Sequence, residues 1–430
     1  MKARYRMNNL AVDTSLPRGV SDYVGDDSQY VDYIERQFLD TAVKWGYSIV
    51  RPAMFEYEDS LLVGVDQTLR SKMFRIDDWQ TGRMLALPPD ITPQVARISA
   101  TRLRKSPYPH RLSYVGRVLR HTETLSGIQR EMLQVGAELI GDASLMADVE
   151  VITIALQTLQ QLGVTSLTMN LGHPMFAKGI FDALGFHGEV LSRVKCAVAR
   201  KDGATIREII KEYKLSDTEA FLLVELPRFF GGLDVLSEIK KHLLPEVCLS
   251  ALQDVEHIAH ALGASGIAVD ITLDLGDTRG LGYHSGVTFE GYCASSTSPL
   301  FSGGRYDTLV RQYGQDAPAT GVTCNTGLIA EVLKKQGIGL SRNNKAIVIW
   351  GNPLDGSELL QMVNQLQREN YIVDINRSAD RLSDVLAYAS IKKIHKVLTI
   401  SGEVLTLRDL QNDTIVKCGY DTYQRELDSI

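Results

Sequence analysis

The sequence predicts an α+β protein with two structured parts, residues 1–335 and 346–430. Segments of helical and of strand periodicity are mixed through the first part, and the stretch from about 174 to 264 within it is almost entirely helical in pattern. After residue 346, strand and helix patterns alternate in βαβαβ order. This order predicts a separate small α/β domain with a partly parallel sheet.

The first elements are a helix, a strand, a hairpin and a second helix. "DDSQYVDYIERQFLDTAVKWGY" carries apolar residues at helical spacing and ends at Gly46. "SIVRPAMFEY" has a strand pattern, and its Pro52 favours an edge position. "SKMFRIDDWQTGRMLALPPD" joins two apolar runs through polar residues, which predicts a hairpin. In "DITPQVARISATRLR" we expect Asp90 or Thr92 to cap a helix, with Pro93 in its first turn.

The rest of the first part continues this mixture. "HRLSYVGRVLRHTETLSGIQREMLQVGAELIG" predicts two strands around a polar loop, followed by the amphipathic helix "LMADVEVITIALQTLQQLG" and the strand "SLTMNLGH". We interpret the helical stretch at about 174–264 as an insertion. Strand alternation returns in "IAVDITLDLGD" and "VTFEGYCA", and "GLIAEVLKKQG" closes the part as a helix. The polar stretch 339–345 then predicts a linker.

Composition excludes several classes of protein. The formal net charge of -6 argues against a generally basic surface for nucleic acid. No apolar run approaches the roughly 18 to 20 residues that a membrane helix needs, and the N-terminus lacks an apolar core of signal-peptide type. The 5 cysteines are scattered and include no CxxC. This pattern indicates reduced thiols, and we therefore expect a cytoplasmic protein.

Four polar residues near a glycine-flanked bend form one candidate site: Arg279, Tyr283, His284 and Glu290. An arginine can hold a carboxylate or phosphate through paired N–H donors, while tyrosine and histidine can hydrogen-bond a polar ligand. Taken alone, this stretch favours a solvated strand with a structural tyrosine over a binding site. Arg305, after two glycines, is either an anion contact or part of an ion pair in a turn.

A stronger indication of a pocket comes from Gln134 and Glu138. They are four residues apart in a predicted strand, so alternation places them on one face with Gly136 between them. Polar groups among apolar neighbours are costly in a core unless they have partners. Asp90 and Thr92 could meet a ligand ammonium, although helix capping accounts for both residues as well.

Other kinds of site are not supported. His257 and His260 lie on a predicted helix without a glutamate or third ligand at metalloprotease spacing, which favours a solvated face. The sequence has no GxSxG motif, no Walker A loop, no dinucleotide-binding GxGxxG after a strand and no Cys/His zinc pattern. We therefore predict neither a metal nor a cofactor.

Taken in order, the motifs of residues 16 to 330 resemble the histidyl-tRNA synthetase family, which has a class II synthetase fold. "LPRGVSDY" resembles the opening motif of that family, and "GYSIVRPAMFEY" resembles motif 1, with Pro52 as its proline. "LALPPDITPQVAR" is similar to the amino-acid-binding "LRPE.T", where Asp90 replaces the glutamate and Thr92 is kept. The resemblance implies an antiparallel sheet flanked by helices, and an anticodon-binding-like domain at 346–430.

The second half of the resemblance concerns the active site. "VLRHTETLSGIQREMLQVGAELIG" resembles motif 2, which makes Arg120 the counterpart of the ATP-contacting arginine. Gln134 and Glu138 match the residues with which the family binds histidine. "RGLGYHSGVTFEGY" is similar to "RGLDYYTG.VFE", with Arg279 at the catalytic arginine and Tyr283 at the first tyrosine. "SGGRYDTL" is a further family element.

Several charged positions of the family pattern are changed. Motif 2 has Thr122 in place of a glutamate and Ile128 in place of a basic residue, and the signature has Gly282 and His284 in place of an aspartate and a tyrosine. Motif 3 places Leu328 where an arginine clamps the γ-phosphate of ATP. A single lost donor of this kind can remove roughly 3 to 4 kcal/mol of transition-state stabilisation. We therefore expect no adenylate formation.

These changes, together with the retained motifs, resemble a paralogous branch, the regulatory subunits of ATP phosphoribosyltransferase. The resemblance implies a non-catalytic protein that joins the short-form catalytic subunit in a hetero-octamer, activates it and takes part in feedback by histidine. It also implies self-association through motif 1. The histidine-binding residues it implies are Asp90, Thr92, Gln134, Glu138, Arg279, Tyr283 and His284.

Three alternatives stay open. Arg120 is assigned as an anion-binding remnant, but Arg120 and Arg279 could equally serve in structural ion pairs. The predicted C-terminal domain keeps a histidyl-tRNA synthetase with drifted motifs as the second interpretation of the chain. The third is a scaffold that binds neither histidine nor ATP.

Overall fold

A computed structural model describes residues 14–63, 70–121, 130–278, 284–339, 345–352 and 356–429 of the chain. The chain divides into two compact units, Met1–Gly339 and Leu340–Ile430. Within the described ranges, no helix is both long and apolar enough to cross a membrane.

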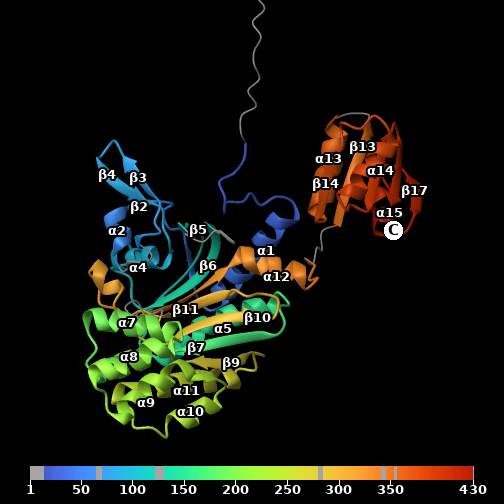
Figure 1. The fold of residues 1–430 in the computed structure, drawn as a ribbon. Helices are drawn as coiled ribbons and strands as arrows, with labels where there is room; N and C mark the ends of the chain where they lie inside the picture. Colours follow the sequence, from blue (N-terminus) through green and yellow to red (C-terminus); the bar gives the residue numbers. More distant parts are fainter. Residues whose placement is uncertain are drawn as a thin grey trace, which may run out of the picture. The chain divides into compact units, whose positions relative to one another are not determined.

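The first unit is built on a sheet of nine strands (Figure 1). All pairs from β5 to β7 across its centre are antiparallel, as predicted. The pairs β1–β5 and β7–β9 near the margins are parallel, and a long crossover joins the two strands of each pair, as parallel pairing requires. In spatial order the strands are β1 Ser48–Val50, β5 His110–Leu119, β6 Glu131–Ile140, β12 Ala319–Asn325, β11 Phe301–Arg305, β10 Thr288–Cys293, β7 Leu167–Gly172, β9 Asp270–Asp274 and β8 Phe230–Gly231.

Helices α1 (Asp26–Lys44), α5 (Leu145–Gln161) and α12 (Thr326–Lys335) share a hydrophobic core with one face of this sheet. Strand alternation in β6 explains the division of faces. Its residues at 133, 135, 137 and 139 are apolar and buried in this core, so those at 134, 136 and 138 point to the opposite face.

The opposite face is partly covered by α4 (Thr92–Thr101), whose apolar residues pack with those of β5. Beside it lies a small sheet of β2 (Glu56–Tyr57), β4 (Arg83–Ala86) and β3 (Arg75–Asp78), next to α2 (Glu58–Leu62). The predicted hairpin is therefore confirmed. Strand β1 ends before Pro52 and lies at the sheet edge, as Pro52 indicated.

The predicted cap of α4 is wrong. Ile91 occupies the N-cap position without a side-chain cap, and Pro93 lies in the first turn as expected. Thr92 is the first residue of the helix and not its N-cap, and its hydroxyl donates to Glu138, at 2.7 Å between oxygens. Asp90 accepts only a long bond from the N–H of Thr92, at 3.5 Å.

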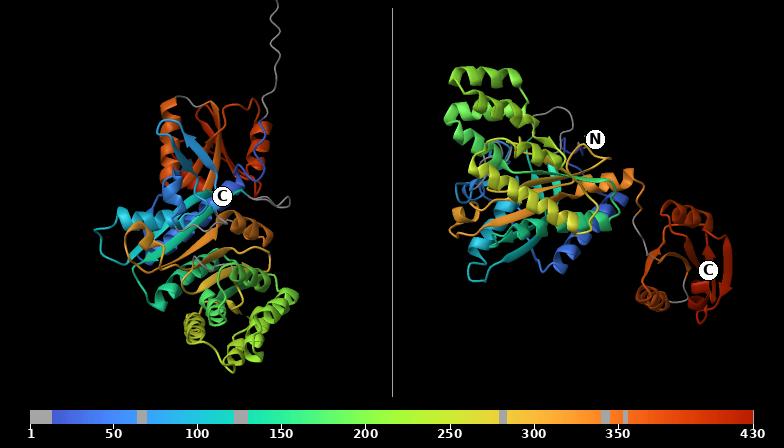
Figure 2. Two further views of the ribbon diagram at one scale, coloured as in Figure 1. Left: turned by 60° about the vertical axis from the view of Figure 1, so that its left-hand side comes forward. Right: turned by 90° about the horizontal axis from the view of Figure 1, so that it is seen from below.

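The stretch 174–264 is helical as predicted, apart from a 3₁₀ turn and strand β8, which pairs with β9. Its helices gather at the β7–β9 end of the sheet (Figure 2). All six contribute buried apolar residues to the main core, and α11 also packs against α5. The helices are α6 Pro174–Ala183, α7 Gly188–Ala199, α8 Gly203–Tyr213, α9 Asp217–Glu225, α10 Asp234–Ile239 and α11 Glu246–Ala264.

The second unit has a five-stranded sheet in the order β14-β13-β15-β16-β17. Strands β14, β13 and β15 are parallel and β15, β16 and β17 antiparallel, which confirms the predicted partly parallel sheet. Two apolar clusters of buried residues form its core. The elements are β13 Lys345–Asn352, α13 Gly356–Arg368, β14 Tyr371–Ile375, α14 Leu382–Ile391, β15 Lys396–Ser401, β16 Val404–Asp409, β17 Thr414–Cys418 and α15 Tyr423–Ser429.

Candidate functional site

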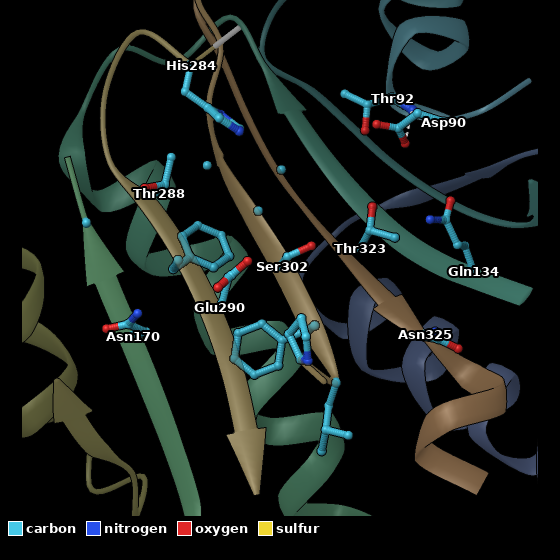
Figure 3. A pocket seen from close by; sticks show the side chains of 18 of the residues that line it. Asp90, Thr92, Gln134, Asn170, His284, Thr288, Glu290, Ser302, Thr323 and Asn325 are labelled. Carbon is cyan, nitrogen blue, oxygen red and sulfur yellow. Dashed lines mark hydrogen bonds between the residues drawn. The ribbon is translucent and has the colours of Figure 1, made fainter. Parts of the chain in front are cut away.

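A cavity of about 490 Å³ lies on the face of the nine-stranded sheet that α4 partly covers. Strands β6, β12, β11, β10 and β7 form its floor, and the segment leading into α4 contributes to its wall (Figure 3). This volume lies within the range of roughly 300–1,000 Å³ that is typical of small-molecule sites. The cavity is therefore a candidate ligand site.

One row of the floor is polar. The strand registers pair Gly136 with Thr323, Thr323 with Ser302, Ser302 with Glu290 and Glu290 with Asn170. Directly opposed residues in a ladder point to the same face, and Figure 3 shows the four side chains on one side of the sheet. This row offers hydroxyl, amide and carboxyl groups to a ligand.

The neighbouring row is almost without side chains. Glu138 pairs with Gly321, which pairs with Gly304, and Thr288 then links Gly304 to Gly172. A Cβ atom built on Gly321 would lie 1.6 Å from Oε2 of Glu138. Glycine at 321 therefore creates the space that the Glu138 carboxyl group occupies.

Glu138 is the centre of a buried hydrogen-bond network. Its side chain is 1% exposed. Oε1 accepts from Oγ1 of Thr92 at 2.7 Å and from the hydroxyl of Tyr114 at 3.2 Å, and Oε2 accepts from the hydroxyl of Tyr306. Tyr114 is also 2.7 Å from Oγ1 of Thr323. Among the described residues, every hydrogen-bond partner of this carboxyl group is a hydroxyl.

Burial raises the pKa of Glu138 to about 8, because a charged carboxylate loses hydration in this cavity. The hydroxyl donors oppose that shift, and the negative charge of Asp90 adds to it. Burial also lowers the pKa of His284 to about 4, against the opposing effects of the Arg305 backbone and of Asp277. The imidazole of His284 is therefore neutral at physiological pH.

Gln134 and Asn325 lie opposite each other at the β6–β12 end of the cavity. Gln134 is 6% exposed, and its Oε1 has no hydrogen-bond partner among the described residues. An unpaired buried acceptor of this kind costs roughly 1–3 kcal/mol until a donor reaches it. Asn325 instead caps α12 by accepting from the N–H of Leu328 at 3.1 Å.

The remaining predicted residues divide into three groups. Arg120 lines the cavity, and its Nε donates to the carbonyl of Pro89 at 2.6 Å. Arg279 and Tyr283 lie outside the described residues. Arg305 forms a buried ion pair with Asp148, with Nη2 2.7 Å from Oδ2, so the ion-pair alternative is confirmed.

Several residues of the site were not predicted from the sequence, among them Tyr114, Tyr306, Thr323 and Asn170. Tyr114 belongs to the alternating pattern of strand β5, and Tyr306 directly follows Arg305 in "SGGRYDTL". Neither pattern indicates Glu138 as the partner, because Tyr306 and Glu138 are 168 residues apart.

The match to the histidyl-tRNA synthetase family model covers residues 19–327. Two relatives named ATP phosphoribosyltransferase regulatory subunit are those of Geobacter sulfurreducens and Syntrophotalea carbinolica. The first is 38% identical, covering 91% of this chain and 90% of the relative. The second is 42% identical, covering 73% of each chain.

Solved structures agree on the fold. A Bacillus halodurans protein described as an ATP phosphoribosyltransferase regulatory subunit/histidyl-tRNA synthetase is 24% identical with a TM-score of 0.74, covering 91% of this chain and 98% of that chain. A histidyl-tRNA synthetase of a Nostoc species is 18% identical with a TM-score of 0.78, covering 97% of this chain and 99% of that chain. At these identities the likeness establishes the fold alone. The family match and the relatives above 30% identity establish more: the chain belongs to the histidyl-tRNA synthetase family and, within it, to the branch of ATP phosphoribosyltransferase regulatory subunits.

Proposed function

We propose that this chain is the non-catalytic regulatory subunit of ATP phosphoribosyltransferase in histidine biosynthesis. In this role it activates the short-form catalytic subunit in the first step of the pathway and takes part in feedback by histidine. The names of relatives at 38% and 42% identity support the proposal. It is also supported by a cavity whose hydrogen-bonding groups are retained while the motif 3 arginine is replaced by Leu328.

The cavity is the proposed site for histidine, and the Glu138 network is the observation that carries this assignment. A buried carboxyl group beside a glycine floor provides an acceptor for a flat ring with an N–H donor. Asp90 is positioned to accept a hydrogen bond from a ligand ammonium group. Oε1 of Gln134 is a second acceptor, which has no donor among the described residues. By family resemblance, Thr92, Arg279, Tyr283 and His284 complete the proposed site, with Arg120 as a remnant that could hold an anion.

The same chain should not activate histidine with ATP. At the place of the motif 3 clamp, Leu328 is partly buried against the core, and the Asn325 side chain is used to cap α12. We expect no histidine-dependent exchange of pyrophosphate into ATP above the background of an enzyme-free sample. Exchange at synthetase-like rates would instead support a histidyl-tRNA synthetase with drifted motifs.

Self-association through motif 1 and assembly into a hetero-octamer are part of the proposal. Strand β1 is a sheet edge, and large apolar side chains around it are exposed, including Ile49 at 48% and Met54 at 77%. Edges and apolar patches of this kind are typical of protein interfaces.

All described cysteines are free thiols, which fits the proposed cytoplasmic location.

The test is phosphoribosyl-ATP formation by the short-form catalytic subunit of the same organism, with and without this chain. We expect a rise in rate that histidine suppresses, and co-elution of the two proteins on a sizing column. An unchanged rate without co-elution would contradict the regulatory role. A rise that histidine does not affect, together with no heat of histidine binding by calorimetry, would indicate a scaffold rather than a sensor.

A further inference from the structure

We propose that Glu138 gives its proton to the ligand. In the empty cavity Glu138 is a neutral acid, and an incoming imidazole ring takes the proton and remains paired with the carboxylate. The cavity thereby selects a weak base that is neutral in solution and becomes a cation when bound. This inference rests on the proposed binding of histidine and adds the charge state in which it is held.

The surroundings of Glu138 favour a neutral acid while the cavity is empty. Its side chain is 1% exposed, and no described Lys, Arg or His forms an ion pair with it. A buried carboxylate without a cation is costly, so the group holds its proton. The pKa of about 8 that burial gives Glu138 agrees with this state at neutral pH.

The titratable groups of the described residues that face Glu138 from neighbouring elements do not supply a positive charge. Asp90, before α4, adds negative charge, and Tyr114 of β5 and Tyr306 after β11 are neutral hydroxyl donors. Tyr47, before β1, also interacts electrostatically with Glu138, and burial raises its pKa above the ordinary value, so it too is neutral.

The nearest basic side chains on the adjoining strands are also occupied or uncharged. Arg305, at the end of β11, pairs with Asp148, and the pKa of His284 is lowered to about 4 by burial. Arg120 lines the cavity and donates to the carbonyl of Pro89. Among the described residues no cation pairs with Glu138, and we assign this role to the ligand.

The proton transfer is balanced within the site. The O–H bond of Glu138 breaks, an N–H bond forms on the unprotonated ring nitrogen of imidazole, and the proton count of the complex is unchanged. An imidazole with a pKa of about 6.5 would not take this proton in water. Contact between opposite charges, however, raises the pKa of the base and lowers that of the acid, each by roughly one to three pH units. The transfer gains this contact only once, so it proceeds when the carboxylate raises the ring pKa by more than about 1.5, the gap between about 6.5 and the pKa of about 8 for Glu138.

The hydroxyl network makes the transfer possible, because it is ready to stabilise the carboxylate once the ring is bound. Thr92 and Tyr114 donate to Oε1 and Tyr306 to Oε2. Hydrogen bonds to the charged form favour ionisation. We assign Tyr306 as a positioning residue that acts on the ligand through Glu138.

The direct test is the ¹⁵N NMR spectrum of ring-labelled histidine bound to the full-length chain at pH 8. Free histidine has a neutral ring at this pH. We expect the imidazolium pattern when it is bound. In Glu138→Gln, which keeps the shape of the side chain but has no proton to give, we expect affinity at least tenfold lower and a neutral ring in whatever complex forms. Glu131→Gln, the same change on β6 at an ion pair with Arg117, should keep the imidazolium pattern.

A pH profile provides the second readout. Above the pKa of Glu138 the empty site has lost its proton, so the affinity for histidine should fall about tenfold per pH unit. Tyr306→Phe removes a donor to the carboxylate, raises the pKa of Glu138 further and should move this fall to higher pH. A merely structural role for Tyr306 would weaken binding without moving the fall.

The possible failures can be distinguished. If histidine does not bind the native chain at all, the histidine-sensing part of the proposed function is wrong. If histidine binds with a neutral ring at pH 8, or if Glu138→Gln leaves both the affinity and the ring spectrum unchanged, the proton transfer is wrong while histidine binding stands.

Discussion

Replacing Arg305 by methionine is expected to lower the free energy of unfolding of the first unit by about 3–5 kcal/mol, the cost of removing one partner from a buried ion pair. The Arg305 and Asp148 side chains are 8% and 0% exposed. Without Arg305, the Asp148 carboxylate is left buried and uncompensated. The carbonyl groups of Asp142 and Ser144 also lose the guanidinium N–H groups that now donate to them at 3.3 and 2.9 Å.

Urea unfolding followed by tryptophan fluorescence checks this value. The two units could unfold separately, so the comparison belongs in a Trp350→Phe background, where the remaining tryptophans, Trp45 and Trp79, both lie in the first unit. Arg311→Met is the matched control. Its ion pair with Asp316 is exposed on both sides, and such pairs contribute about 0–1 kcal/mol.

A double variant then separates the charge from the packing. Replacing Asp148 by leucine together with Arg305→Met removes both charges, and an apolar pair of suitable volume often restores stability. We expect the double variant to recover a large part of the loss. Equal stability of Arg305→Met and Arg311→Met would contradict the assignment of Arg305 as a structural ion pair.

The sequence was informative wherever one element determines the outcome. Helical spacing predicted the buried side of α1, where Ile34, Phe38 and Ala42 are buried. Strand alternation placed Gln134 and Glu138 on one face of β6. In each case the periodicity of the backbone fixes the direction of the side chains, so no knowledge of neighbouring elements is needed.

What the sequence could not provide depends on contacts between distant segments. The polar row from Thr323 to Asn170 exists only because four strands pair in one particular register. The cap of α4 was predicted wrongly for a related reason. A threonine at the start of a helix is a good local cap, but here the helix begins at Thr92 itself, and its hydroxyl donates to a buried carboxyl group 46 residues away. A hydrogen bond to so distant a residue cannot be predicted from a local sequence pattern.

Replacing Glu138 by alanine is expected to weaken histidine binding by more than tenfold. Hydrogen bonds to charged groups contribute about 1.5–3 kcal/mol, and 1.4 kcal/mol already corresponds to a factor of ten. Calorimetric titration measures the affinity, and Glu131→Ala, a change on the same strand at an ion pair with Arg117, is the matched control.

The same variant distinguishes the regulatory role from the sensing role. Glu138 lies inside the cavity of the first unit, on a face of β6 that does not contribute to the main core. A variant that still folds should therefore activate the catalytic subunit as the native chain does, while inhibition requires more than ten times as much histidine. If inhibition moves by this factor and activation stays, activation and histidine sensing are separate properties of the subunit. An unchanged titration would place histidine at another site, such as a contact between subunits. The cavity would then be a remnant of the synthetase ancestry and not the sensor.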